Sequence, residues 1–420
     1  MNQSFTPREF IDKINAENPG PAFDPYGVDG LIIKQQEDSA GADLLARAKT
    51  DASIHKEKWQ RIEAYRAQAD EIINKLRNES GNLGWSYESY VLDIEIYEAT
   101  NDSLLRDELI GRTRNILSHS SNSYNDSLQQ KSVYGLILTL AENDELDLAL
   151  ELCDLYDKKY PDSPRESIII QIAEKGDIER AVLLAEAYAG SIYSPKDDIY
   201  SFIVVELIKN NNKDRALELI DRISSDSKKS ITFSKMYKIT NDSDYILKAD
   251  KLANGITRYH PYEKTIALLE IYIAKKDRRY LDDVLFYLND VKTDERESLL
   301  STIGAELAKN DFDDDALDMM NEIRDAQKYT RVYAEIAKSF ARNGKVEEAK
   351  EMLNNIEINS HYRRAIILEI IKGYMAKDDV DNAKGMASET MGFNNTARAW
   401  AVIAKSLYEK ANNLEGSFMA

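Results

Sequence analysis

A period of about 33 residues is the feature that most constrains the fold of this 420-residue chain. The segment Tyr333–Phe340 (YAEIAKSF) is echoed by Trp400–Leu407 (WAVIAKSL), which begins 67 residues later and therefore two periods along the chain. Repeats of this length are typical of stacked pairs of helices. An Ala, replaced once by Leu, marks the same period with gaps of 32 to 35 residues, at Ala149, Ala181, Ala216, Ala249, Leu281, Ala316, Ala349 and Ala383.

Each repeat divides into two amphipathic helices joined by a short polar turn. In the clearest repeat, Tyr333, Ile336 and Phe340 fall at helical spacing and form one apolar stripe. Asn343-Gly344 ends this stripe, because Gly readily takes the left-handed conformation found just after a helix. A second stripe begins at Val346. The same reasoning predicts turns at residues 175–177, 210–212, 309–311 and 377–379, which are rich in Asn, Asp and Gly.

This pattern resembles the tetratricopeptide repeat, a helical hairpin of about 34 residues. The residues that carry the resemblance are Tyr333, Ile336, Ala337, Phe340, Ala349, Leu353 and Ile356 in one repeat, and Leu300, Ile303, Gly304, Leu307, Ala316, Met320 and Ile323 in the preceding one. Pro161 and Pro261 stand where that family often has a terminal Pro. The match is sharp from about residue 298 onward, and neighbouring classes of helical repeat remain alternatives for the earlier units.

We therefore predict an all-α fold, a right-handed α/α superhelix (α-solenoid) of about nine helix-turn-helix repeats over residues 84–420. A capping helix over residues 396–411 is expected to close the array with a polar outer face. Residues 1–80 break the period and are predicted to form a separate helical segment with an irregular loop at residues 17–40.

The N-terminal segment contains one strongly amphipathic helix, predicted over residues 53–77. The simplest expectation is that this helix packs on the first repeat. The alternative is that it binds a partner or a second copy of the chain. Its apolar stripe comprises Ile62, Tyr65, Ala69, Ile72, Ile73 and Leu76.

Composition argues against several classes of function. A net charge of −19 disfavours nucleic acids and anionic membranes as partners. Cys153 is the only cysteine, which excludes an intrachain disulfide and a cysteine-based metal site. No stretch approaches the roughly 18 apolar residues of a membrane span, and the N-terminus lacks the apolar core of a signal peptide. We expect a cytoplasmic protein, with export by a route that needs no such signal as the alternative.

No catalytic or metal-binding motif is present, so we expect neither enzymatic activity, nor a cofactor, nor a bound metal. The histidines are scattered, and no phosphate-binding loop or nucleophile motif occurs. The acidic cluster at residues 311–315 lacks the Gly and the terminal Glu of a calcium loop. It precedes a predicted helix, whose positive N-terminal end it would stabilise.

A basic residue opens each repeat, although a cation in the first turn of a helix is disfavoured by the helix dipole. Its recurrence predicts an inter-repeat ion pair, or a hydrogen bond to a carbonyl of the preceding helix. A row of anion sites is the alternative. We also expect Ala349 and Ala383 to lie where the two helices of a pair touch most closely. The basic positions are Lys131, Arg165, Lys196, Lys229, Lys264, Arg296, Arg331, Arg364 and Arg398.

A second set of cations suggests a binding surface. Lys338, Lys372 and Lys405 occupy the repeat position that faces the concave groove in tetratricopeptide proteins, and Arg342 lies one turn beyond Lys338. The resemblance therefore implies that these four residues bind an acidic peptide. The alternative is that Glu335 and Glu369, each three residues before a lysine, simply neutralise Lys338 and Lys372.

These features favour a scaffold or adaptor that binds a peptide or protein partner, possibly an acidic one, on the concave face of the solenoid. The competing hypothesis is a regulatory or secreted effector. Such a protein would act through its N-terminal segment and use the solenoid as a targeting module.

Overall fold

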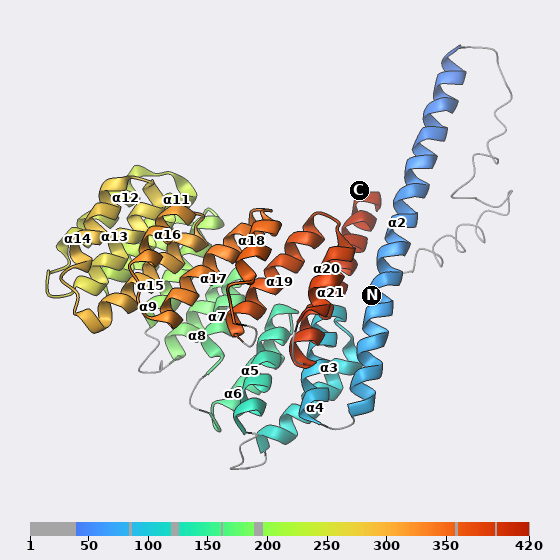
Figure 1. Ribbon diagram of the computed structural model, residues 1–420, viewed down its shortest axis with the longest axis horizontal. Helices are drawn as coiled ribbons and strands as arrows, with labels where there is room; N and C mark the ends of the chain where they lie inside the picture. The colour runs from blue at the N-terminus through green and yellow to red at the C-terminus, as the bar shows by residue number, and fades with distance from the viewer. Residues whose placement is uncertain are drawn as a thin grey trace. The chain divides into compact units, whose positions relative to one another are not determined.

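The computed structural model describes residues 39–83, 86–118, 126–160, 163–188, 196–357, 360–390 and 393–419. Over these ranges the chain forms twenty helices and no strand (Figure 1), which confirms the predicted all-α class. The loop predicted at residues 17–40 lies outside the described residues as far as residue 38. Residues 39 and 40 already belong to the first described helix.

Short turns connect most of the helices. The helices are α2 (Ser39–Leu83), α3 (Tyr87–Thr100), α4 (Ser103–Ser118), α5 (Asp126–Glu142), α6 (Leu146–Tyr156), α7 (Arg165–Glu174), α8 (Ile178–Ala187), α9 (Lys196–Lys209), α10 (Lys213–Ile220), α11 (Asp226–Thr240), α12 (Ser243–Gly255), α13 (Pro261–Lys275), α14 (Arg278–Leu288), α15 (Thr293–Lys309), α16 (Asp313–Asn321), α17 (Ala326–Arg342), α18 (Val346–Leu353), α19 (His361–Ala376), α20 (Val380–Ser388) and α21 (Phe393–Met419).

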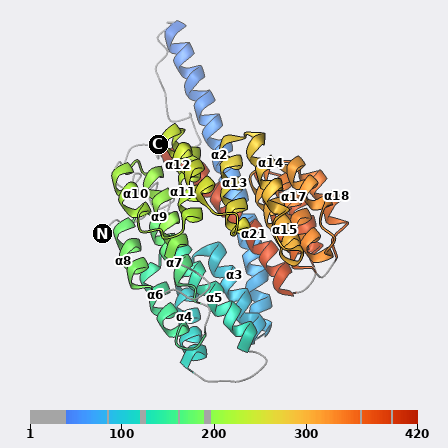
Figure 2. The same cartoon turned by 90° about the vertical axis from the view of Figure 1, so that its left-hand side faces the viewer.

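The helices pack in the order in which they occur in the chain. From α3 to α19, each odd-numbered helix packs against the even-numbered helix that follows it. Each odd-numbered helix from α3 to α17 also packs against the next odd-numbered one (Figures 1 and 2). From α3 to α20 these contacts join helices that are near neighbours in sequence, which is the packing expected of a helical repeat fold.

The recurring Ala and Leu positions are fully buried in this packing. All eight, from Ala149 to Ala383, lie in even-numbered helices and have no exposed surface. A continuous cluster of buried residues runs from Tyr90 in α3 to Ile336 in α17. The period found in the sequence therefore marks the core.

Five predicted turns share one backbone feature. In each, a single residue adopts a positive φ, between 59° and 88°, which ends the first helix and redirects the chain. Gly accounts for two of the five, and Asn or Asp, which tolerate this conformation better than most residues, for the others. These residues are Gly176, Asn211, Asp311, Gly344 and Asp378.

The repeated phrase Thr-Asn-Asp-Ser, at residues 100–103 and 240–243, has the same local structure in both places. The Thr hydroxyl donates to the carbonyl four residues earlier, at 2.8 and 2.9 Å. The Asn takes a left-handed conformation, with φ of 51° and 57°. The Asp carboxylate then accepts a hydrogen bond from the backbone N–H two residues later, at 3.0 and 3.1 Å. One sequence phrase thus encodes both a helix stop and the next helix start.

The chain divides into two compact units, residues 75–403 and residues 1–74 with 404–420. In the second unit, Arg66 of α2 forms an ion pair with Glu415 of α21. The Tyr408 hydroxyl also donates to Asp70 at 2.6 Å. The sequence placed a boundary near residue 80 and a solitary capping helix at 396–411. The structure instead extends α21 to Met419 and pairs its C-terminal half with α2.

The amphipathic helix predicted over residues 53–77 is part of the longer α2. Its apolar stripe is buried at all six predicted positions, from Ile62 to Leu76. Near the C-terminal end of α2, the Ser80 hydroxyl donates to Asp93 of α3 at 2.5 Å. That contact is the kind expected if this end of the helix packs on the first repeat.

Candidate protein-binding groove

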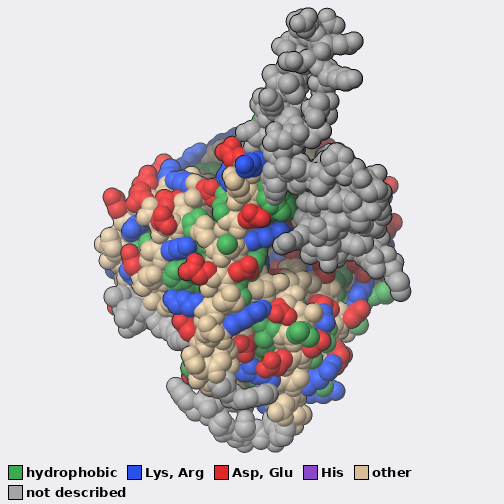
Figure 3. All heavy atoms as spheres, turned by 90° about the vertical axis from the view of Figure 1, so that its right-hand side faces the viewer, with side chains coloured by type: hydrophobic (Ala, Val, Ile, Leu, Met, Phe, Trp, Pro, Cys, Tyr) green, Lys and Arg blue, Asp and Glu red, His purple; other side chains and the backbone are tan. Residues whose placement is uncertain are grey.

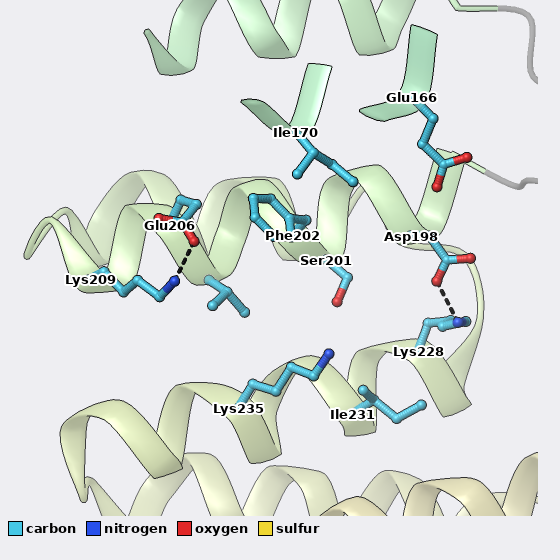
Figure 4. A pocket seen from close by; sticks show the side chains of 11 residues that line it. Glu166, Ile170, Asp198, Ser201, Phe202, Glu206, Lys209, Lys228, Ile231 and Lys235 are labelled. Carbon is cyan, nitrogen blue, oxygen red and sulfur yellow. Dashed lines mark hydrogen bonds and ion pairs between the residues drawn. The ribbon is translucent and has the colours of Figure 1, made fainter. Parts of the chain in front are cut away.

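A groove of about 200 Å³ lies on the face formed by α7, α9 and α11, which pack side by side (Figure 4). We call it the α7–α11 groove. Helix α9 buries Ile199 and Ile203 toward the core and exposes Asp198, Phe202 and Val205 to the groove. The lining residues are Glu166, Ile170, Asp198, Ser201, Phe202, Val205, Glu206, Lys209, Lys228, Ile231 and Lys235.

The middle of the groove is apolar. Ile170 of α7 and Phe202 of α9 lie close to one another across the helix junction in Figure 4. Val205 and Ile231 add further apolar surface from α9 and α11. Ile170, Phe202 and Val205 remain partly exposed, although residues of this type are usually covered in a stable fold. The groove therefore offers apolar surface that the described part of the chain leaves accessible.

Charged side chains surround this apolar surface. Lys228 of α11 forms an ion pair with Asp198 of α9, and Lys209 pairs with Glu206 one turn earlier at 2.5 Å (Figure 4). Lys235 is exposed, and no described acidic group lies within ion-pair distance of its ammonium. Lys235 does act at longer range on Glu270 of α13. Burial raises the pKa of the Glu270 carboxyl, and the positive charge of Lys235 opposes that rise.

Buried polar contacts fix α9 against α11 beneath the groove. The hydroxyls of Ser201 and Thr232 are 2.7 Å apart and form a hydrogen bond between the two helices. Asp197, at the start of α9, accepts bonds from the connection that leads into α11. The Ser201–Thr232 contact is buried, and the Asp197 side chain is buried although its Ser224 partner is exposed, so both contacts tie α9 to α11 beneath the groove.

Two of the four predicted C-terminal cations form ion pairs within their own helices. Lys338 pairs with Glu335 at 2.5 Å, and both side chains are largely buried, at 20% and 13% exposure. Lys372 pairs with Glu369 at 2.9 Å. These are the intrahelical pairs that formed the alternative interpretation of this set. Arg342 is exposed at the end of α17, and Lys405 is half-buried in α21, within the other compact unit.

The basic residues that open the repeats behave in more than one way. Lys196 and Lys264 donate to carbonyls of Glu186 and Ile256 at 2.9 and 3.2 Å, at the ends of the preceding helices, as predicted. Arg296 instead pairs with Glu322 at 2.8 Å. Glu322 caps α16, the helix that pairs with α15, so this contact lies inside one helix pair and not between repeats.

At α19 the expected role belongs to the neighbouring residue. Arg363 donates to the carbonyls of Leu353 and Ile356, at 2.6 and 3.3 Å, at the end of α18. Arg364 is exposed, and neither it nor Arg331 forms an ion pair or side-chain hydrogen bond with a described residue. The Arg398 side chain lies 3.9 Å from Glu95 of α3.

Sequence reasoning overlooked two features of the site. The first is the acidic residue that follows a repeat-opening cation. Glu297 accepts a backbone hydrogen bond from Asp325 at 3.2 Å, just as Asp197 accepts from Ser225. The recurring pairs Lys196-Asp197 and Arg296-Glu297 were the available signal. The second is the groove itself, which the run of apolar residues in the middle of α9, too broad for a single buried face, could have indicated.

Other kinds of site find no support in the described ranges. No group of three His, Cys, Asp or Glu side chains there is arranged to hold a metal ion. None of the described helices combines the length and the apolar character required to cross a membrane. On the face shown in Figure 3, acidic and basic side chains are interspersed. No known protein-family model matches the sequence, and no curated protein matches it significantly.

Proposed function

We propose that this protein is a tetratricopeptide-like scaffold that binds a peptide or protein partner. In this proposal the helix pairs, about nine in number, form a right-handed α/α superhelix, and the odd-numbered helices line its concave face. The observation that carries the proposal is the α7–α11 groove. Its apolar middle, charged rim and buried polar supports are the elements of a preformed binding surface.

The size of the groove favours a side chain as its occupant. Sites for small organic ligands usually have volumes of about 300–1,000 Å³. The α7–α11 groove, at about 200 Å³, is smaller and has room for one or two side chains of a larger partner. Its lining contains no His or Cys, and the hydroxyl of Ser201 is already bonded to Thr232. Binding is therefore better supported than catalysis.

We place the partner contact on the α7–α11 groove and not on the predicted C-terminal lysines. The charges of Lys338 and Lys372 are already neutralised by glutamates of their own helices. The groove combines exposed apolar surface with a cation outside such pairs, Lys235. Apolar anchors in desolvated pockets supply most of the affinity in protein interfaces.

Affinity capture from a cell extract, with the intact chain as bait, tests this proposal. Phe202→Asp would place a charge on the apolar floor and should abolish capture of a specific partner. Leu183→Asp is the matched control, because Leu183 is 65% exposed on α8 and does not line the groove. Ile170→Glu changes the same groove from a different helix, so loss of capture in both variants could not be attributed to a local folding defect at residue 202. Unchanged capture by both groove variants, at wild-type melting temperature, would contradict the proposal.

A further inference from the structure

We propose that the α7–α11 groove selects a partner segment in which an apolar residue is followed or preceded, two positions away, by Asp or Glu. The apolar side chain would lie on the apolar floor beside Ile231 and Phe202, and the carboxylate would pair with Lys235. This inference rests on the function proposed above and adds the chemistry of the recognised segment.

The charge balance of the lining identifies Lys235 as the recognition group. Three acidic and three basic residues line the groove. The Asp198–Lys228 and Glu206–Lys209 pairs neutralise two of the cations. Lys235 is the remaining cation and Glu166 the remaining acid, and no described acid, Glu166 included, lies within ion-pair distance of the Lys235 ammonium. A single point charge matches the single negative charge of a carboxylate.

The position of Lys235 gives the spacing. Lys235 lies four residues after Ile231 on α11, which corresponds to about 6 Å along the helix axis. A segment in extended conformation advances about 3.3 Å per residue. A side chain over the apolar floor near Ile231 is therefore separated by about two residues from one that reaches Lys235.

The charge of the whole chain explains why an acid would be accepted here in particular. A protein with a net charge of −19 repels anionic segments in general. The lining of the groove has no net charge, so the lining itself adds nothing to this repulsion where the apolar floor is exposed. Charge complementarity of this kind selects among partners more than it adds affinity. The apolar contact would supply the binding energy, and Lys235 the preference for an acidic neighbour.

Panning of a phage-displayed library of random dodecapeptides on the intact chain tests the inference. The expected consensus has Leu, Ile, Phe or Met two positions from Asp or Glu. Panning on Lys235→Glu should replace the acidic position with Lys or Arg. A synthetic peptide with the wild-type consensus should bind Lys235→Glu at least about tenfold more weakly. Lys251→Glu is the matched control, because Lys251 is exposed on α12, outside the groove.

The outcomes separate this inference from the proposed function. A consensus without an acidic position, or one unchanged by Lys235→Glu, would overturn the inference. The proposed site would still stand if the same peptides failed to bind Phe202→Asp. Selected peptides that bind Phe202→Asp and Ile170→Glu as well as the wild type would refute the site itself. A library that yields no enriched sequence on the folded wild-type chain would count against both.

Discussion

The carboxylate of Asp197 accepts two hydrogen bonds from Ser224, one from the backbone N–H at 2.9 Å and one from the hydroxyl at 2.8 Å. A third comes from the N–H of Ser225, the residue that caps the N-terminus of α11, at 2.9 Å. Asp197 is only 7% exposed. One buried carboxylate thus joins the start of α9 to the start of the next odd-numbered helix.

Removal of this carboxylate should weaken the junction beneath the groove. Asp197→Ala leaves the backbone N–H groups of Ser224 and Ser225 without these acceptors, and we expect the free energy of unfolding to fall by about 1–3 kcal/mol. Urea denaturation of the full chain measures this loss. Asp221→Ala, at an exposed position just after α10, should change stability by less than about 0.5 kcal/mol. Equal losses in the two variants would show that the hydrogen bonds of Asp197 contribute no more to stability than an exposed Asp does.

Two adjacent arginines at the start of α19 should differ sharply in their contribution to the stability of the fold. Arg363 binds the C-terminal carbonyls of α18, whereas Arg364 is exposed and contacts no described acidic group. Hydrogen bonds from charged donors are worth about 1.5–3 kcal/mol. We therefore expect Arg363→Ala to lower the melting temperature by several degrees and Arg364→Ala to leave it nearly unchanged. The reverse order would restore Arg364 to the role that the sequence suggested.

Gly304 tests how closely α15 and α17 approach. A Cβ atom at this position would lie 2.8 Å from Cγ1 of Val332, which is fully buried. Gly304→Ala should therefore overpack the contact and destabilise the chain by about 1–3 kcal/mol.

Gly111→Ala supplies the control, because nothing lies within 4 Å of its added Cβ in the middle of α4. There the methyl group should stabilise the helix by about 0.5–1 kcal/mol. Thermal melts that move in the same direction for both variants would contradict the close approach at Gly304.

Periodicity made much of the fold predictable. A helix must return an apolar residue to the core every three to four positions, and stacked repeats must return a small residue once per repeat. Both requirements appear directly in the sequence, so buried positions such as Ala349 and turn residues such as Gly344 could be foreseen. The lengths of α2 and α21 were harder to predict from the sequence. Their pairing joins residues that are more than 330 positions apart, and no local pattern encodes it.

The side-chain partners were harder to predict than the helices. A cation at the start of a helix can reach a carbonyl, an acid of the paired helix or solvent, and rotations of a few degrees decide which. At equivalent positions, Lys264 binds a carbonyl, Arg296 pairs with an acid of the paired helix, and Arg364 faces solvent. The groove was overlooked for a related reason, because the middle of α9 has apolar residues on several sides and the sequence does not show that Phe202 and Val205 stay partly exposed. Only packing shows which of those sides stays uncovered.

The C-terminal lysines provide the sharpest comparison between the two candidate surfaces. Changing both Lys338 and Lys372 to Glu removes two intrahelical ion pairs and creates two like-charge pairs with Glu335 and Glu369. On a helix surface such an exchange costs a few tenths of a kcal/mol, as expected for the more exposed Glu369–Lys372 pair, and it costs more at the largely shielded Glu335–Lys338 pair, so a fall in melting temperature is expected. Capture of the partner should persist, because these charges are already neutralised in the free protein, whereas Lys235→Glu should reduce it.

The opposite pattern would relocate the site. If the double variant lost its partner at a nearly unchanged melting temperature while Lys235→Glu retained it, the partner would bind the C-terminal set that the sequence first indicated. A collapse of folding in the double variant would show that the Glu335–Lys338 pair, which is largely shielded from water, is a structural element of α17. Parallel measurement of melting temperature and partner capture on the three proteins distinguishes these results.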